Sequence, residues 1–256
     1  MKLQVLGSGS CLISQERTSS GYIVQTRGQK IMVDTGTGTS ESLRRLGLDS
    51  SDLDTIINTH RHPDHVSDLI PIVQDKVVNS FQSDQSKITL MGPGGHRNYL
   101  DRRMHDEMRA SPSEVEEKFG FKIEINELEG KNKFEEIEIS SISANHGPED
   151  FPCLSVRISS EKDIVFSGDT DYFEELIDFS RGADLLVADC SKPDEEKVSG
   201  HMTPTECAEI AEEAQVKKLV LSHLYPEAES FNLKEKASKT FQGEVVVAED
   251  LATIEI

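Results

Sequence analysis

The chain has 256 residues, of which 36% are hydrophobic, and a formal net charge of −20 at pH 7. This length allows one large domain or two small ones, and no apolar run is long enough to span a bilayer. The negative charge disfavours non-specific attraction to nucleic acid, although it does not exclude a local basic patch. The chain starts with a predicted strand instead of a signal peptide, and its four cysteines are scattered. We therefore expect a cytoplasmic protein with free thiols.

The first part of the chain reads as strands around a Gly/Ser-rich loop. Strands are predicted at 3–6 and, as a hairpin, within 22–34, followed by a helix at 40–47 and a strand at 54–59. The loop Gly7–Ser10 lacks the Lys-Ser/Thr of a P-loop and the third glycine of a dinucleotide fingerprint, so it is a weak nucleotide signal.

The remainder alternates between groups of strands and groups of helices. A helix is predicted at 67–79, interrupted early by Pro71, and a charged helical pair at 96–119. Further strands are predicted at 87–91, 121–128, 134–142, 153–159, 163–167, 184–189, 217–222 and 244–249, and helices at 171–180, 204–214 and 233–240. Two sheets with helices outside each would bury the apolar strands. We therefore predict one domain over 1–256, a four-layer αββα sandwich of two similar halves.

A histidine-rich segment, Thr59–His65, follows the strand at 54–59. His60 and His62 alternate, so both imidazoles can face the same way and bind one cation. Asp64 and His65 offer a carboxylate and an imidazole to a second cation. This combination, without thiolates, suits zinc, iron or manganese. The alternative is a polar surface loop, which the downstream residues make the poorer interpretation.

Four further polar residues follow predicted strands, where sites collect in layered α/β folds. Asp34 is either the N-cap of the helix at 40–47 or a carboxylate that orients a metal-bound histidine. His146, Asp169 and His223 each follow a later strand. Any one of the three would more often be a cap or a surface residue, but together they point to a common site.

These residues resemble the pattern of the metallo-β-lactamase superfamily of hydrolases. The matching segments run through most of the chain in the family's order: Val33–Gly36, His60-x-His62-x-Asp64-His65, His146, Ser167–Thr170 and His223. The resemblance implies an αββα fold with two divalent metal ions. Zinc is the first candidate for these ions, and manganese and iron are the alternatives.

The resemblance also implies how the ligands are divided. His60, His62 and His146 would hold one metal; Asp64, His65 and His223 would hold the other; Asp169 would bridge them. Two cations that share a water lower its pKa and supply hydroxide near neutral pH. Asp64 would additionally orient that water.

Within the superfamily, the sequence looks most like the ribonuclease Z branch. The marks are Leu6–Ser10, Ser19–Tyr22, and Gly200–Thr203 ahead of an Ala-rich helix. By resemblance His201 would protonate the leaving oxygen, paired with a carboxylate. That carboxylate is Asp189 here, where the family has Glu, so its reach is one methylene shorter.

Another departure concerns RNA binding. The segment before His146 contains no Lys-rich hairpin of the kind that clamps tRNA in ribonuclease Z. Its most basic part, with Arg97, Arg102, Arg103 and Arg109, is interpreted equally as a phosphate contact or as a solvated face.

We therefore expect a metal-dependent phosphodiesterase that acts on a small molecule or an RNA 3′ end, with Asp64, His201 and Asp189 as catalytic residues. Its relatives suggest a homodimer by analogy. The alternatives are a tRNA 3′-processing endoribonuclease, a thioester or lactone-type hydrolase, and a non-catalytic binding module.

Overall fold

The structure of the chain is a computed structural model that describes residues 1–82, 86–134, 136–148 and 150–256. In these ranges the strands form two seven-stranded sheets. The first sheet contains, in spatial order, β14 (Thr253–Glu255), β1 (Lys2–Gly7), β2 (Gly21–Thr26), β3 (Gln29–Val33), β4 (Thr55–Ile57), β5 (Lys87–Gly92) and β6 (Lys122–Glu127). The second contains β13 (Glu244–Val247), β12 (Lys218–Ser222), β11 (Leu185–Asp189), β10 (Asp163–Phe166), β9 (Leu154–Ser159), β8 (Ile137–Ser143) and β7 (Lys131–Phe134).

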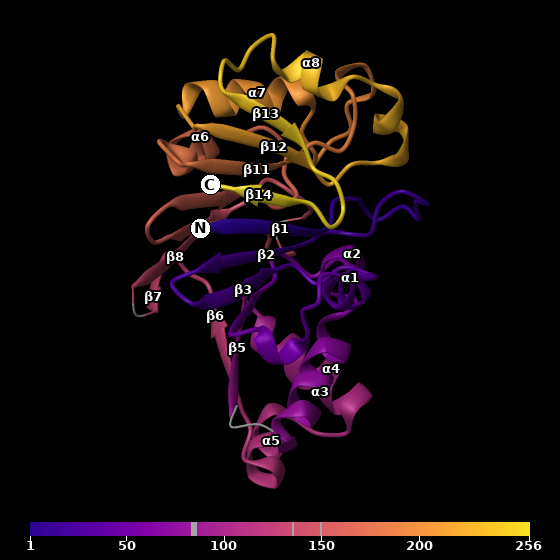
Figure 1. Ribbon diagram of the computed structural model, residues 1–256, viewed down its shortest axis with the longest axis vertical. Coiled ribbons are helices and arrows are strands. Elements are labelled where there is room, and N and C mark those ends of the chain that lie inside the picture. Colours follow the sequence, from indigo (N-terminus) through magenta and orange to yellow (C-terminus); the bar gives the residue numbers. More distant parts are fainter. Residues whose placement is uncertain (83–85, 135, 149) are drawn as a thin grey trace.

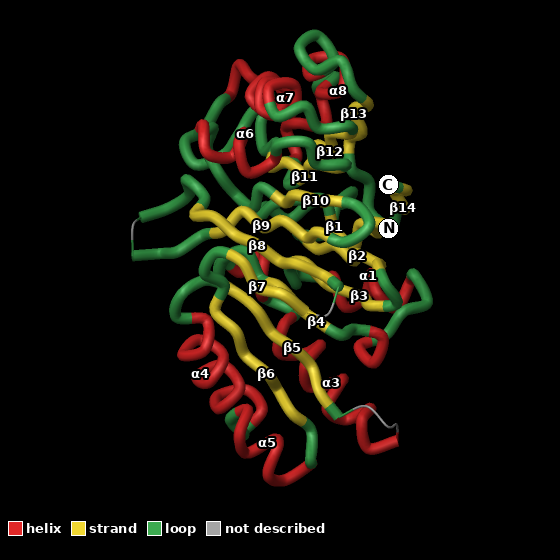
Figure 2. The backbone as a smooth tube through the Cα atoms, turned by 90° about the vertical axis from the view of Figure 1, so that its left-hand side faces the viewer, coloured by secondary structure: helices red, strands yellow, loops and turns green. Residues whose placement is uncertain are grey.

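Helices cover the outer side of each sheet (Figure 1). The first sheet carries α1 (Thr39–Arg45), α2 (Pro63–Val66), α3 (Leu69–Asn79), α4 (His96–Met108) and α5 (Pro112–Phe119). The second carries α6 (Glu174–Ser180), α7 (Pro204–Glu213) and α8 (Leu233–Ala237). Figure 2 shows α4 and α5 running beside β6. Short 3-10 helices lie at Ser50–Asp52, Ser80–Gln82, Asp194–Glu196 and Pro226–Ser230. No helix of the described residues is long and apolar enough to cross a membrane.

Three hydrophobic cores separate the four layers. The central core joins the facing sides of the two sheets and includes Val5, Val33, Val156 and Val187. One outer core packs the first sheet against α1 and α3–α5, and the other packs the second sheet against α6–α8. Successive residues of a strand point to opposite faces; Leu186, next to Val187, accordingly belongs to an outer core. The predicted αββα sandwich is confirmed.

Three local predictions differ from the structure. Pro71 lies in the first turn of α3, where a missing N–H is tolerated, so the helix starts at Leu69 and is not interrupted. Residue 135, within the strand predicted at 134–142, lies outside the described residues, and two antiparallel strands, β7 and β8, lie on either side of it. The last strand, β14, was not predicted; it pairs antiparallel with β1 of the first sheet.

The topology places the carboxyl ends of the parallel strands at a common edge. β3 and β4 run parallel in the first sheet, and β10, β11 and β12 run parallel in the second. Loops that leave such ends meet in space, which is where α/β folds build their sites.

Candidate metal centre

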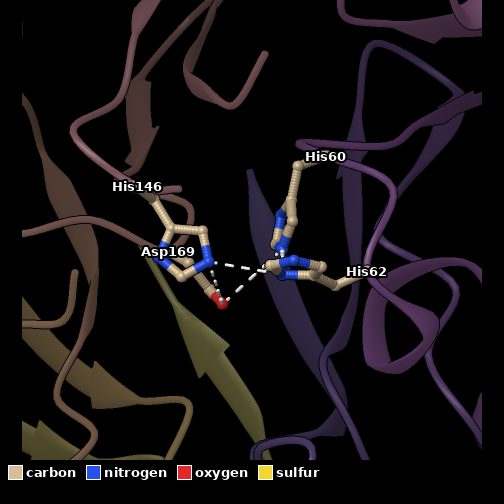
Figure 3. Close-up of side chains that lie close together, drawn as sticks. All are labelled: His60, His62, His146 and Asp169. Carbon is tan, nitrogen blue, oxygen red and sulfur yellow. Dashed lines mark hydrogen bonds and ion pairs between the residues drawn. The ribbon is translucent and has the colours of Figure 1, made fainter. Parts of the chain in front are cut away.

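One group of donor atoms lies between the two halves of the chain (Figure 3). His60 and His62 come from the loop after β4, and His146 and Asp169 come from the second half. His62 Nδ1 lies 2.9 Å from His60 Nε2 and 3.3 Å from His146 Nε2. Asp169 Oδ2 lies 3.6 Å from His60 Nε2 and 3.9 Å from His146 Nε2. The four donor atoms surround one point.

A second group shares Asp169 with the first. His223 Nε2 lies 3.3 Å from Asp64 Oδ2 and 3.4 Å from Asp169 Oδ2. His65 Nε2 lies 3.6 Å from Asp64 Oδ2 and 3.2 Å from Asp169 Oδ1. Asp169 Oδ2 therefore faces histidines of both groups, as a bridging carboxylate would. All seven residues singled out from the sequence as metal ligands are brought together here.

The donor sets fit divalent cations. Nitrogen ligands about 2.1 Å from a tetrahedral zinc are about 3.4 Å apart, and the separations above run from 2.9 to 3.9 Å. His65 Nε2 is also buried without a hydrogen-bond partner among the described residues, although it points at the carboxylates of Asp64 and Asp169. A buried unpaired nitrogen is costly unless something binds it. A cation at this position would satisfy it.

In the first half, a hydrogen bond to the ring nitrogen on the side away from the cluster orients His65. His65 Nδ1 donates to Asp34 Oδ2 at 2.8 Å, which leaves Nε2 free for a cation. Asp34 is held in turn by the backbone N–H of Thr59, at 2.8 Å. The N-cap of α1 is Gly38, so of the two interpretations of Asp34 the geometry supports the histidine-orienting one.

In the second half, the orienting groups are a carbonyl and a hydroxyl. His146 Nδ1 donates to the Gly200 carbonyl at 2.8 Å. His223 Nδ1 donates to Ser191 Oγ at 2.9 Å, and that hydroxyl donates to Asp189 Oδ1 at 2.6 Å. Both histidines are thereby held in the tautomer that directs Nε2 toward the cluster.

Asp189 also reaches the candidate proton donor. Its Oδ2 accepts from His201 Nδ1 at 2.8 Å, so the shorter side chain still makes a direct bond. The His201 ring stacks on the His223 ring with centroids 5.3 Å apart and lies 4.9 Å from the His146 ring. His201 therefore stands beside one histidine of each group.

Burial and charge act against each other on these residues. Burial alone would raise the pKa of Asp169, but His223, His65 and His60 hold it well below its usual range. Burial lowers the pKa of His201, and the Asp189 carboxylate more than offsets this, so that the pKa is raised. Asp169 is thus ionised at neutral pH. The Asp189 carboxylate favours the protonated form of His201.

The sequence reasoning did not identify several residues at this site. Ser191 joins Asp189 to His223. Phe151 stacks on His62 with centroids 4.7 Å apart. The Tyr225 ring lies 5.8 Å from the His201 ring and borders the site with Lys192 above its face. Tyr225 follows His223 by two residues, which was the only local signal for it.

A cavity of about 430 Å³ opens beside Asp64. Its walls are the loop of residues 11–19 on one side and Thr37, Gly38 and Pro63 on the other. The loop contributes the exposed apolar side chains of Leu12 and Ile13. The volume is in the range of small-molecule sites.

The basic stretch has acidic residues among its arginines, and two of the arginines are engaged within the protein. Arg103 pairs with Glu107, and Arg97 donates to the Ile125 carbonyl at 2.5 Å. Asp101 and Asp106 lie in the same helix, α4. Of the two interpretations of this stretch, these contacts support the solvated face.

The sequence profile that describes the anti-Pycsar protein Apyc1 family matches residues 1–246. The chain belongs to the Apyc1 family. Ribonuclease Z of Methanosarcina acetivorans is 28% identical, with 100% of this chain and 98% of that protein covered. The probable metallo-hydrolase YhfI of Bacillus subtilis is also 28% identical, with 97% of each covered.

Solved structures show the same fold. Crystal structures of YhfI and of the short form of human tRNase Z superpose with TM-scores of 0.84 and 0.77, at 24% and 22% identity. Each covers 100% of this chain and is itself covered to 99%. The predicted metallo-β-lactamase-fold, ribonuclease Z-like hydrolase is confirmed, and with it the expectation of a divalent-metal enzyme.

Proposed function

We propose that this Apyc1-family chain is a phosphodiesterase for small substrates that uses two divalent metal ions. Zinc is the first candidate for both ions. His60, His62 and His146 would hold one ion, Asp64, His65 and His223 would hold the other, and the Asp169 carboxylate faces both groups. The observation that carries the proposal is the shared Asp169 carboxylate, 3.2–3.9 Å from the facing histidine nitrogens of both groups. When bound, the two cations lower the pKa of a shared water and neutralise charge on a phosphoryl oxygen.

The protein's own residues divide the remaining work. Asp64 accepts a hydrogen bond from the attacking water and orients it. Asp189 holds His201 through Nδ1, so Nε2 is the atom that carries a proton to the departing alkoxide. Protonation of the leaving oxygen avoids expulsion of a strongly basic anion and contributes about 10²–10⁴-fold to such reactions.

Two observations support a small substrate over tRNA. The alignment with the Methanosarcina ribonuclease Z runs over 306 positions, more than the 256 residues of this chain, so that protein has segments without a counterpart here. The alignment with YhfI runs over 255 positions, which is not more than the length of this chain. The Arg-rich helix α4 is also compensated by nearby acids, within a chain of net charge −20.

The test compares three substrates on protein whose metal content has been measured. Bis-p-nitrophenyl phosphate, a dinucleoside monophosphate and a 3′-extended tRNA precursor are offered to the wild type and to His201→Ala. His105→Ala, an exposed histidine in α4, is the matched control. We expect two metal ions per chain, diester turnover without tRNA cleavage, and a loss in His201→Ala that is largest for the dinucleoside.

The other outcomes would each contradict part of the proposal. Efficient single-site cleavage of the tRNA precursor would make the protein a tRNA 3′-processing endoribonuclease. Absence of phosphodiester turnover in metal-loaded protein would overturn the proposal and direct the search to thioesters and lactones.

A further inference from the structure

The segment that carries His201 is fixed to the loops of His146 and Asp171 through the backbone of one residue, Gly200. The Gly200 carbonyl accepts from His146 Nδ1 at 2.8 Å, and the Gly200 N–H donates to Asp171 Oδ2 at 2.9 Å. Both contacts come from residues more than 25 positions earlier in the chain. The backbone next to His201 is therefore held from both sides.

Glycine is favoured at this position for two reasons. Gly200 has φ +85°, in the left-handed region that side-chain-bearing residues rarely adopt. A Cβ there would also lie 3.1 Å from His146 Nδ1. The close approach of the 197–201 segment to the metal-facing histidine is thus built into the backbone.

Asp171 joins the backbone of Gly200 to two charged side chains. Its Oδ1 accepts from Lys197 Nζ at 2.6 Å, and Lys197 also donates to Glu206 Oε2 at 2.5 Å. Glu206 belongs to the first turn of α7 and caps that helix by accepting from Thr203 N–H. Asp171 itself is tied to the His146 loop, since its N–H donates to the Asn145 carbonyl at 2.9 Å.

Resting on the proposed function, we infer that Asp171 is a positioning residue for proton delivery. It holds Gly200 N–H and Lys197, and thereby places the His201 imidazole over the leaving oxygen without touching the substrate. Asp189 sets the tautomer of His201, whereas Asp171 sets the position of its backbone. Loss of Asp171 should therefore reduce the rate only when the leaving group needs a proton.

The choice of leaving group separates this role from a structural one. The p-nitrophenolate of bis-p-nitrophenyl phosphate is a stable anion that needs no proton, whereas a dinucleoside monophosphate expels an alkoxide. In Asp171→Ala we expect kcat on the dinucleoside to fall by about 10- to 100-fold. The rate on bis-p-nitrophenyl phosphate should stay within about twofold and the metal content should be unchanged. Asp178→Ala, an exposed carboxylate on α6, should match the wild type on both substrates.

A double variant tests whether Asp171 acts through His201. Asp171→Ala added to His201→Ala should cause no further loss on the dinucleoside, because residues that act as a unit are not additive. Additive losses would overturn the inference. Equal losses on both substrates in the single variant, or loss of metal, would also overturn it and assign Asp171 to the support of His146.

Histidine-ring NMR provides a readout that needs no turnover. The His201 ring signal, assigned by its absence in His201→Ala, should shift or broaden in Asp171→Ala and stay unchanged in Asp178→Ala. An unchanged signal in Asp171→Ala would refute the positioning role. If the wild type hydrolyses no phosphodiester, the proposed function fails, and this measurement still decides the placement of His201.

Discussion

Each half of the molecule buries one aspartate behind its metal-facing histidines, and the two aspartates have different numbers of histidine partners. Within the described residues, the carboxylate of Asp34, just after β3, accepts from one histidine, His65, and otherwise from Thr59. Asp189, at the end of β11, accepts directly from His201 and, through Ser191, is connected to His223. The first half therefore contributes candidate metal ligands, whereas the second half combines candidate metal ligands with a candidate proton donor.

The difference follows from the loops that surround each strand end. A short loop connects β4 to α2, so His60, His62 and His65 come from one continuous segment. In the second half, His146, His201 and His223 come from three separate segments. Carboxylate, hydroxyl and carbonyl groups hold these separate segments together.

The largest expected effect comes from the residue that both halves share. Asp169→Asn keeps the size of the side chain but removes the bridging charge. Because metal-assisted stabilisation amounts to several kcal/mol, we expect a loss on the order of 10⁴-fold in kcat/KM. Steady-state kinetics with metal analysis checks this. A variant that kept two metal ions and near-normal activity would remove Asp169 from the site.

Asp189→Asn should impair proton delivery, a function that Asp34 in the first half does not share. It disturbs His201 and His223 together, so we expect about a 10³-fold loss on a dinucleoside monophosphate. The matched Asp34→Asn should instead weaken metal binding by about 10- to 100-fold, with activity restored by added metal. Titration of both variants with Zn²⁺ distinguishes the two. If excess metal rescued Asp189→Asn fully, its link to proton delivery would be wrong.

The first half also contains a buried histidine that belongs to neither metal group. Burial, followed by the charge of Arg61, lowers the pKa of His96 to about 4, and neither ring nitrogen has a hydrogen-bond partner among the described residues. A pKa below the unfolded value means that protonation favours unfolding. The stability is complete above about pH 6.5 and decreases toward pH 4, by about 3 kcal/mol.

This pH dependence can be isolated from that of the metal site. Denaturant unfolding of metal-free wild type and His96→Phe is measured between pH 7 and pH 4. Protonation of the histidines at the metal site is common to both, so the variant should lose about 3 kcal/mol less than the wild type over this range. Identical pH profiles would show that folding does not lower the pKa of His96.

The smallest expected effect on stability comes from two helix caps, one in each half. Ser111 and Thr203 both form capping boxes with Pro at the next position, on α5 and α7. Replacing either with Ala should reduce the free energy of unfolding by about 1 kcal/mol. Only Thr203→Ala should also slow turnover of the dinucleoside, because its helix anchors the His201 segment through Glu206. Equal kinetics in the two variants would indicate that this anchoring is dispensable.

Much of the fold and the candidate ligand set was predictable from the sequence because the signals are local. The spacing of His60, His62, Asp64 and His65 places four donors within six residues, wherever the rest of the chain goes. Apolar strands followed by polar residues located His146, Asp169 and His223, since parallel strands that end at one edge bring their loops together.

Tertiary structure decided the partners that lie far apart in sequence. The antiparallel pairing of β14 with β1, the neutralisation of α4 by its own acids, and the tie from His146 to Gly200 have no local pattern. Whether the shorter Asp189 side chain reaches His201 depended on how closely the end of β11 packs against the segment that carries His201. Such distances are set by packing between segments, because hydrogen bonds lose their strength within less than 1 Å of separation. The sequence by itself therefore determined the fold and the donor types, and only the packed chain decided which residue orients each donor.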